Sequence, residues 1–141
     1  MDESMKHRIR RLFEEALPFN HFLGIRVVDV GDGFVHLELP FRPEFVGDPL
    51  RPALHGGVLS TLIDTAGGAA TFTKLSPSAV VSTIDLRVDY LLPAAPELIA
   101  AEAHVVRVGN RVCVIDARLY HPSAPGHTVA TGKGVYNVHR K

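Results

Sequence analysis

The apolar positions between residues 54 and 72 recur at helical spacing and predict the longest helix of the chain. They fill one arc of a helical wheel and are occupied by Val58, Leu59, Leu62, Ile63, Ala66, Ala69 and Ala70. Asp64 falls on the opposite, small and polar arc, together with Gly57, Ser60, Gly68 and Thr71. The stretch 47–52 before this helix contains two prolines and a glycine, which exclude regular structure. We therefore expect the helix to begin sharply at His55-Gly56-Gly57, with its first amides unpaired.

Alternating apolar and polar residues predict strands on both sides of this helix. Residues 25–30 and 34–41 form a hairpin around the turn Gly31-Asp32-Gly33. A long strand, 80–92, follows the helix, and its outward residues are Thr83, Asp85, Arg87 and Asp89. The opposite set should pack under the helix and consists of Ile84, Leu86, Val88, Tyr90 and Leu92. Strands 98–108 and 111–120 form a second hairpin around Gly109-Asn110, and 128–138 is the last strand.

A narrow apolar stripe with basic residues around it predicts an N-terminal helix over residues 2–17. Pro18 ends this helix, and residues 19–24 form a tight connection to the first strand. No helical pattern separates the last four strands, so the sheet should be largely antiparallel. We expect a single α+β domain, residues 1–141 with the N-terminal helix in 1–18, whose sheet wraps around one long central helix.

The composition excludes several classes of function. The chain has 15 basic and 15 acidic residues and a net charge of zero, so nothing draws it to nucleic acid or to an anionic membrane. No uncharged apolar run approaches the length of a membrane span. Cys113 is the single cysteine, lies in an apolar strand and is expected to be inert, which fits the reducing cytoplasm. The eight histidines are scattered, so we expect no metal site.

The candidate catalytic residues lie at the start of the central helix, at His55-Gly56-Gly57, and near its middle, at Asp64. Unpaired amides at a helix start carry partial positive charge and can hold an oxyanion, and His55 could assist or could simply hold the loop. Gly56 and Asp64 are eight residues apart, which is ~12 Å along a helix. One carbonyl therefore cannot touch both within one chain. Two copies packed antiparallel about a two-fold axis would bring Asp64 of one near Gly56 of the other, which predicts a homodimer or a dimer of dimers.

His-Gly-Gly followed by an aspartate seven positions after the second glycine resembles the hot-dog-fold thioesterases of the phenylacetic-acid-pathway type. The stretches 20–25 and 80–94 are similar to the same family, and the resemblance runs from about residue 19 to 138. It implies a coenzyme A thioesterase in which the Gly56 amide polarises the thioester carbonyl. Asp64 of the other subunit would be the nucleophile or the general base, and Thr83 would assist. Coenzyme A is part of the substrate, so no separate cofactor is expected.

The resemblance also implies where the substrate binds. Its coenzyme A contacts map onto Tyr90 and onto the second hairpin turn, Gly109, Asn110 and Arg111, while Gly57 lets the substrate approach the backbone. Because the chain is neutral, the ligand phosphates should be met by a few local basic residues, first Arg111 and then Lys133. Two alternatives stay open: a hot-dog hydratase or dehydratase acting on acyl thioesters, and a non-catalytic acyl-coenzyme A-binding module, which would not need Asp64.

Overall fold

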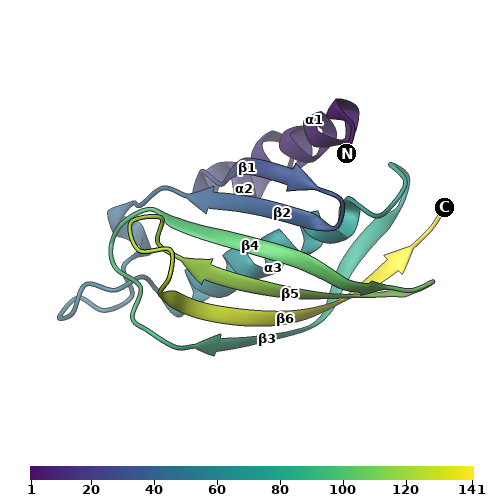
Figure 1. Cartoon of the computed structure of the whole chain (residues 1–141). Coiled ribbons are helices and arrows are strands. Elements are labelled where there is room, and N and C mark those ends of the chain that lie inside the picture. Colours follow the sequence, from purple (N-terminus) through teal and green to yellow (C-terminus); the bar gives the residue numbers. More distant parts are fainter.

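The computed structural model describes residues 1–141, in which a six-stranded antiparallel sheet wraps around one long helix (Figure 1). The strand order is β1-β2-β4-β5-β6-β3, so β1 and β3 form the two edges. The helical elements are α1 (Glu3–Arg10), the π-helical turn η1 (Arg11–Ala16), α2 (Pro18–Leu23), the 3-10 turn η2 (Pro43–Phe45) and α3 (Gly56–Phe72). The strands are β1 (Arg26–Gly31), β2 (Phe34–Leu39), β3 (Val80–Tyr90), β4 (Ile99–Val108), β5 (Val112–Tyr120) and β6 (Thr128–His139).

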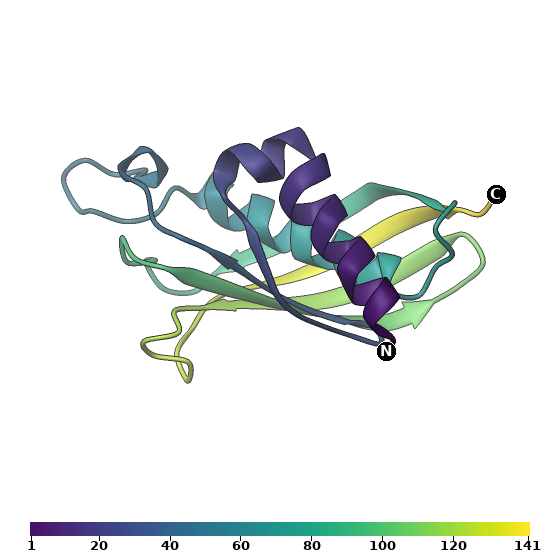
Figure 2. The ribbon, with the colours of Figure 1, turned by 90° about the horizontal axis from the view of Figure 1, so that it is seen from above.

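The core lies between α3 and the inner face of the sheet. Leu62, Ile63 and Ala66 of α3 are fully buried, and so are the inward residues of β2, β4 and β5. This arrangement confirms the predicted antiparallel sheet around a central helix. The helices α1, η1 and α2 lie on the same side of the sheet as α3 (Figure 2). No helix of the structure combines the length and the hydropathy that a membrane span requires.

The N-terminal helices cover the β1 edge and leave the β3 edge bare. Glu14 of η1 accepts a hydrogen bond from the Val27 amide at 3.2 Å, and the Arg10 side chain reaches the Val27 carbonyl at 3.5 Å. The main-chain groups of β1 are thereby partly satisfied. The other edge carries exposed apolar side chains, with Val80, Ile84 and Tyr90 each about half accessible. The exposed side chains of β3 also include Ser82, Asp85 and Arg87, so the edge is mixed in polarity. A strand edge of this length without a partner is a surface suited to pairing with another strand.

Residues 18–23 are helical, with Gly24 as the cap, which corrects the prediction of a connection over residues 19–24. Pro18 is the first residue of α2 and does more than end the preceding helix. Proline is well suited to this position, because the first residue of a helix has no amide partner to lose. Leu17 is extended between the two helices, and α2 ends at Gly24, whose positive φ of 84° favours glycine.

A β-bulge in β3 changes which side chains of the first half of the strand point toward α3, and the prediction for Thr83 and Ile84 is wrong. The register with β6 shifts between Thr83 and Asp85, so that Ile84 is left over and is 56% exposed. Leu86 and Val88 face α3 as predicted, but Thr83 is turned to the same inner side, opposite Tyr136. The strand also ends at Tyr90, and Leu92 is exposed instead of packing under the helix. A bulge adds one residue and thereby reverses the alternation on one side of it.

The C-terminal part of α3 is buried on all sides, which corrects the placement of Thr71 on a polar face. Its side chain is fully buried, donates to the Gly67 carbonyl at 2.9 Å and lies 3.4 Å from the Cys113 sulfur. Burial raises the pKa of the Cys113 thiol. The thiol is therefore protonated and enclosed in the core, in agreement with the prediction of an inert cysteine.

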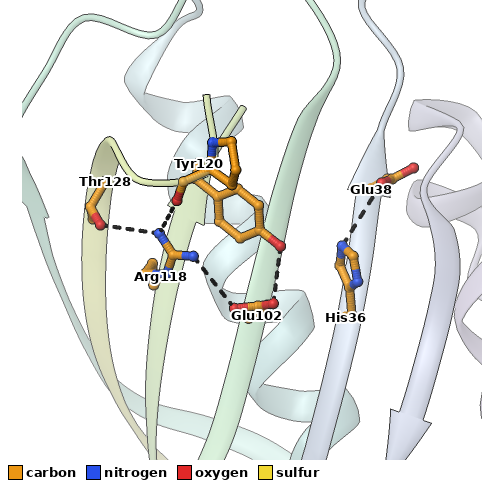
Figure 3. A network of polar contacts seen from close by, with 7 residues as sticks. His36, Glu38, Glu102, Arg118, Tyr120 and Thr128 are labelled. Carbon is orange, nitrogen blue, oxygen red and sulfur yellow. Dashed lines mark hydrogen bonds and ion pairs between the residues drawn. The ribbon is translucent and has the colours of Figure 1, made fainter. Parts of the chain in front are cut away.

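The outer face of the sheet carries a network of polar side chains (Figure 3). Glu102 accepts from the Tyr120 hydroxyl at 3.0 Å and pairs with Arg118 at 3.7 Å, and His36 lies 3.8 Å from Glu38. Lys133 belongs to the same face, where it pairs with the Asp116 carboxylate at 2.6 Å. These side chains point away from α3, so the outer face contributes nothing to chemistry at Asp64.

Candidate functional site

The start of α3 presents one free amide. His55 is the N-cap: its ring Nδ1 accepts from the Gly57 amide at 2.8 Å, and its carbonyl accepts from the amides of Val58 and Leu59. The Gly56 amide has no hydrogen-bond partner in the structure. A 17-residue helix directs its partial positive charge to this end. The Gly56 N–H is therefore the one amide at the start of α3 that is available to an acceptor outside the chain.

The Asp64 carboxylate is held by two hydroxyl groups. Thr83 of β3 donates to Asp64 Oδ1 at 2.8 Å. The Tyr136 hydroxyl of β6 donates to the Asp64 main-chain carbonyl at 2.8 Å and lies 3.2 Å from the same Oδ1. No lysine, arginine or histidine pairs with this carboxylate. Asp64 is therefore fixed in position while its second oxygen, Oδ2, is left without a protein partner.

Tyr136 reaches Asp64 because glycines make room for it. A Cβ at Gly67 would collide with the Tyr136 hydroxyl, and a Cβ at Gly134 would lie 2.8 Å from its ring. Tyr136 is only 1% exposed. Its burial, and then the negative charge of Asp64, raise the pKa of the Tyr136 hydroxyl far above its usual value. The hydroxyl is thus a permanent donor at any physiological pH.

An apolar pocket of about 270 Å³ opens beside Asp64 and Thr83. Most of its wall is apolar and comes from η1, α3 and β3; it includes Leu12, Phe13, Leu17, Gly68, Phe72 and Val81. Asn20 of α2 also lines it, is only 5% exposed, and keeps its side-chain Nδ2 without a hydrogen-bond partner. Because a buried amide donor without an acceptor is costly, this group is suited to a polar atom of a ligand.

The residues around Gly56 form a second, separate surface. The Tyr90 hydroxyl donates to the Gly56 carbonyl at 3.1 Å, and the Tyr90 ring lies against Gly56. An apolar groove of about 360 Å³ runs beside them and is lined by Ala53, Leu54, Leu59, Leu91, Leu92, Pro93 and Ala94. Asp64 does not belong to this groove, and Gly56 does not belong to the pocket beside Asp64.

The remaining predicted binding residues lie apart from both surfaces. The Gly109-Asn110 turn is held from the C-terminal end of the chain, where the Arg140 side chain donates to both of their carbonyls. The Arg111 side chain has no polar partner in the structure and is exposed. Lys133 is engaged by Asp116 on the outer face of the sheet. Of the two basic candidates, Arg111 is therefore the one free to meet an anionic ligand.

A test of the Tyr136 contact follows from its pKa. The folded protein keeps this phenolic proton where the unfolded chain loses it, at about pH 10. The raised pKa therefore adds to the free energy of unfolding in full below about pH 10, and this contribution is lost as the pH rises further. We expect Tyr136→Phe to be less stable by about 1 kcal/mol at neutral pH, and to lose stability less steeply between about pH 10 and 11.5 than the unmodified chain. Urea unfolding across this range measures both effects, and parallel pH slopes for the two proteins would contradict the assignment.

Sequence comparisons identify the family. The family model of the thioesterase superfamily matches residues 52–124, which include the start of α3, Asp64 and Thr83. The chain belongs to the thioesterase superfamily. It is 42% identical over 126 residues to a candidate esterase of Halobacterium salinarum, a match that covers 84% of this chain and 83% of that protein. It is 32% identical over 126 residues to the medium/long-chain acyl-CoA thioesterase YigI of Escherichia coli, with 80% and 81% of the two chains covered.

Solved structures of the superfamily share the architecture. A thioesterase family protein from Silicibacter pomeroyi superposes with a TM-score of 0.87 at 28% identity, covering 97% of this chain and 99% of that one. A protein from Shewanella oneidensis related to the thioesterase superfamily gives 0.81 at 28% identity, with 99% and 100% covered. These matches confirm the predicted hot-dog fold and the prediction of a thioester-hydrolysing enzyme.

Two residues beside Asp64 escaped the sequence reasoning. Tyr136 looked like an ordinary inward residue of the last strand, although the glycines two and four positions before it, Gly134 and Gly132, marked a close approach. Asn20 was noticed only as part of the family resemblance. Its polar side chain between the phenylalanines of α2 was the available signal, but nothing in the chain placed it in the same pocket as Asp64.

Proposed function

We propose that this protein hydrolyses acyl-coenzyme A thioesters to the free acid and coenzyme A, at a site shared between two copies of the chain. The observation that carries the proposal is the Asp64 carboxylate, fixed by Thr83 and Tyr136 at the wall of an apolar pocket and without a cationic partner. The name of the YigI relative supports acyl-coenzyme A as the substrate class. The Gly56 amide supplies the complementary group for the thioester oxygen.

Strand β3 is the element that would bring the two copies together at the shared site. This strand forms a sheet edge without a neighbouring strand, and it contacts both groups that are expected to act on the thioester. Thr83 near its start donates a hydrogen bond to Asp64, and Tyr90 at its end donates one to the Gly56 carbonyl. If two β3 edges pair antiparallel about a two-fold axis, the start of one strand meets the end of the other. Asp64 of one copy then approaches Gly56 of the other, and the pocket beside Asp64 becomes continuous with the partner's groove beside Gly56.

Such a site has the groups that a thioester needs. The Gly56 N–H and the helix dipole stabilise the oxyanion that forms as the carbonyl carbon is attacked. Asp64 acts as the general base for water or as the nucleophile itself. The thiol of coenzyme A is a good leaving group, so no Ser-His-Asp triad is required. His55 holds the Gly56 amide in place through its cap, and the Asn20 amide donates to a polar atom of the bound thioester.

The direct test is hydrolysis of a panel of acyl-coenzyme A substrates, followed by release of free thiol. We expect turnover of at least one member, with no added metal or cofactor. Tight binding of acyl-coenzyme A without thiol release would instead favour the non-catalytic binding module. Hydration of an unsaturated acyl chain without thiol release would favour the hydratase alternative.

The phosphates of coenzyme A give a separate prediction. Arg111 is exposed and has no polar partner, whereas Lys133 is paired with Asp116. We expect Arg111→Ala to raise KM about tenfold with kcat nearly unchanged, because it removes binding that is equal in the ground and transition states. Lys133→Ala is the matched comparison and should leave KM close to that of the unmodified protein. Steady-state kinetics measure both, and an effect of Lys133→Ala alone would move the phosphate contact to the outer face.

A further inference from the structure

We infer that the pocket beside Asp64 is an acyl-chain gauge, a pocket that selects the acyl group by its length. The π-helical turn η1 forms its cover, Gly68 sets its width, and Phe72 limits its length, so that it accepts an acyl chain of medium length. This inference rests on the proposed thioester hydrolysis and specifies the acyl group.

The floor of the gauge is one stripe of α3. Asp64, Gly68 and Phe72 follow one another at intervals of four residues, so they lie on the same face of the helix. All three line the same pocket. The stripe runs about 12 Å from the carboxylate to the Phe72 ring. A chain attached to a carbonyl at Asp64 therefore passes over Gly68 before it meets Phe72.

Gly68 is the point of the stripe at which space is free. A Cβ at this position would meet a single neighbouring atom, a Tyr136 ring carbon at 3.8 Å, which is an ordinary contact. The adjacent Gly67 is different, since a Cβ there would collide with Tyr136 and Ile115. Gly67 is thus required by packing within the chain, whereas the absence of a side chain at Gly68 leaves room in the pocket.

The cover is built by η1. The Leu17 amide bonds to the Leu12 carbonyl five residues earlier, at 3.0 Å, which is the wide spacing of a π-helix. This wide turn brings Leu12, Phe13 and Leu17 to the same pocket. π-helical turns of this kind are frequent at functional sites. The cover is anchored through the contacts of Arg10 and Glu14 with β1, so it is a fixed wall.

Two of the residues that line the pocket, Phe13 and Phe72, pack against each other at the C-terminal end of the α3 stripe. The rings of Phe13 and Phe72 meet edge to face, with centroids 5.8 Å apart. The pocket volume of about 270 Å³ lies just below the range of ~300–1,000 Å³ usual for whole small-molecule ligands, so the pocket suits part of a substrate. If each methylene occupies about the 30 Å³ of a water molecule, the pocket holds roughly six to ten carbons. Coenzyme A itself would lie outside this pocket, along the partner copy's groove beside Gly56.

The experiment measures kcat/KM for a series of straight-chain acyl-coenzyme A substrates from about four to about sixteen carbons, a range that extends to both sides of the roughly six to ten carbons that the pocket holds. We expect an optimum at medium length for the unmodified protein. Gly68→Val fills the pocket beyond Asp64 and should lower the ratio of eight-carbon to four-carbon activity by about tenfold or more. Leu12→Ala opens the cover and should raise the ratio of twelve-carbon to eight-carbon activity by about tenfold.

Two further variants serve as comparisons. Arg11→Ala alters the neighbouring residue of η1, whose exposed side chain does not line the pocket, and should keep the original length profile. Leu92→Ala removes the same atoms as Leu12→Ala, but from the groove beside Gly56. Gly68→Ala serves as a second variant if the valine substitution unfolds the chain, because alanine is the better helix former, and a smaller shift in the same direction is expected.

The outcomes separate the inference from the proposed function. Opposite shifts for Gly68→Val and Leu12→Ala support the gauge. An active enzyme whose length profile is unchanged by both variants, or is changed by Leu92→Ala instead, overturns the gauge and leaves thioester hydrolysis standing. An unmodified protein that hydrolyses no member of the series overturns the proposed function itself.

Discussion

Asp64→Asn is expected to lower kcat by ~10²–10⁴-fold, the usual contribution of a positioned base, while the chain stays at least as stable. The substitution keeps the shape of the side chain and an oxygen that can accept from Thr83. It removes the charge and the basicity of a carboxylate that has no cationic partner and that would become more buried between two copies. Loss of activity together with unchanged or higher stability is the signature of a working group, because a purely structural carboxylate would show the reverse.

The measurement pairs kcat on the best acyl-coenzyme A substrate with the melting temperature. Asp32→Asn is the matched control, since it makes the same chemical change in an exposed turn where the carboxylate pairs with Lys74. The control should keep full turnover. Near-normal turnover of Asp64→Asn would remove this residue from the mechanism and would favour the binding module.

The second large effect is expected from Gly56→Pro, which removes the hydrogen-bond donor that would hold the oxyanion. Proline has no N–H, and the Gly56 N–H has no partner within the chain, so the fold loses no hydrogen bond. Proline is favoured at the first position of a helix. The preceding residue must be extended, and His55 already is, with φ −60° and ψ 135°. A Cβ at this position would lie 3.4 Å from the nearest Tyr90 atom, which the exposed ring can accommodate.

We expect Gly56→Pro to lower kcat by ~10²–10³-fold, as for the loss of one oxyanion donor. Its stability should be equal or higher by about 0.4–1 kcal/mol, because proline restricts the unfolded chain. Gly56→Ala is the control, since it adds the same Cβ but keeps the N–H, and it should retain most of the activity. Equal losses in both variants would indicate that crowding at Tyr90, rather than the missing donor, is responsible.

The sequence was most informative where a pattern depends on neighbours along the chain. Helical spacing from Val58 to Ala70 and the irregular stretch before it located α3 and its start at Gly56. Alternation located the strands, and the absence of helices between the last four predicted their antiparallel pairing. The motif at His55-Gly56-Gly57 and Asp64 was readable because its meaning rests on local geometry, a helix start and a residue two turns further on.

The parts that the sequence did not reveal depend on contacts between distant segments. The bulge that turns Thr83 toward Asp64 is set by the pairing of β3 with β6, and simple alternation assigned Thr83 to the outer face. The contact of Tyr136 with Asp64 joins residues 72 positions apart. The burial of Thr71 depends on Cys113 in a strand across the core. Such tertiary pairings override local periodicity, which therefore cannot predict them.

The measurement that tests the shared site most directly uses Asp64→Asn and Gly56→Pro in one dimer. The two variants are produced together with different affinity tags, and the mixed dimer is purified through both tags. If Asp64 of one copy works with Gly56 of the other, the mixed dimer contains one intact pair and one doubly defective pair. The mixed dimer is expected to show about half of the unmodified activity per dimer, far above that of either variant alone. If each site instead lay within a single chain, every chain of the mixed dimer would be defective, and activity at the level of the separate variants would contradict the account.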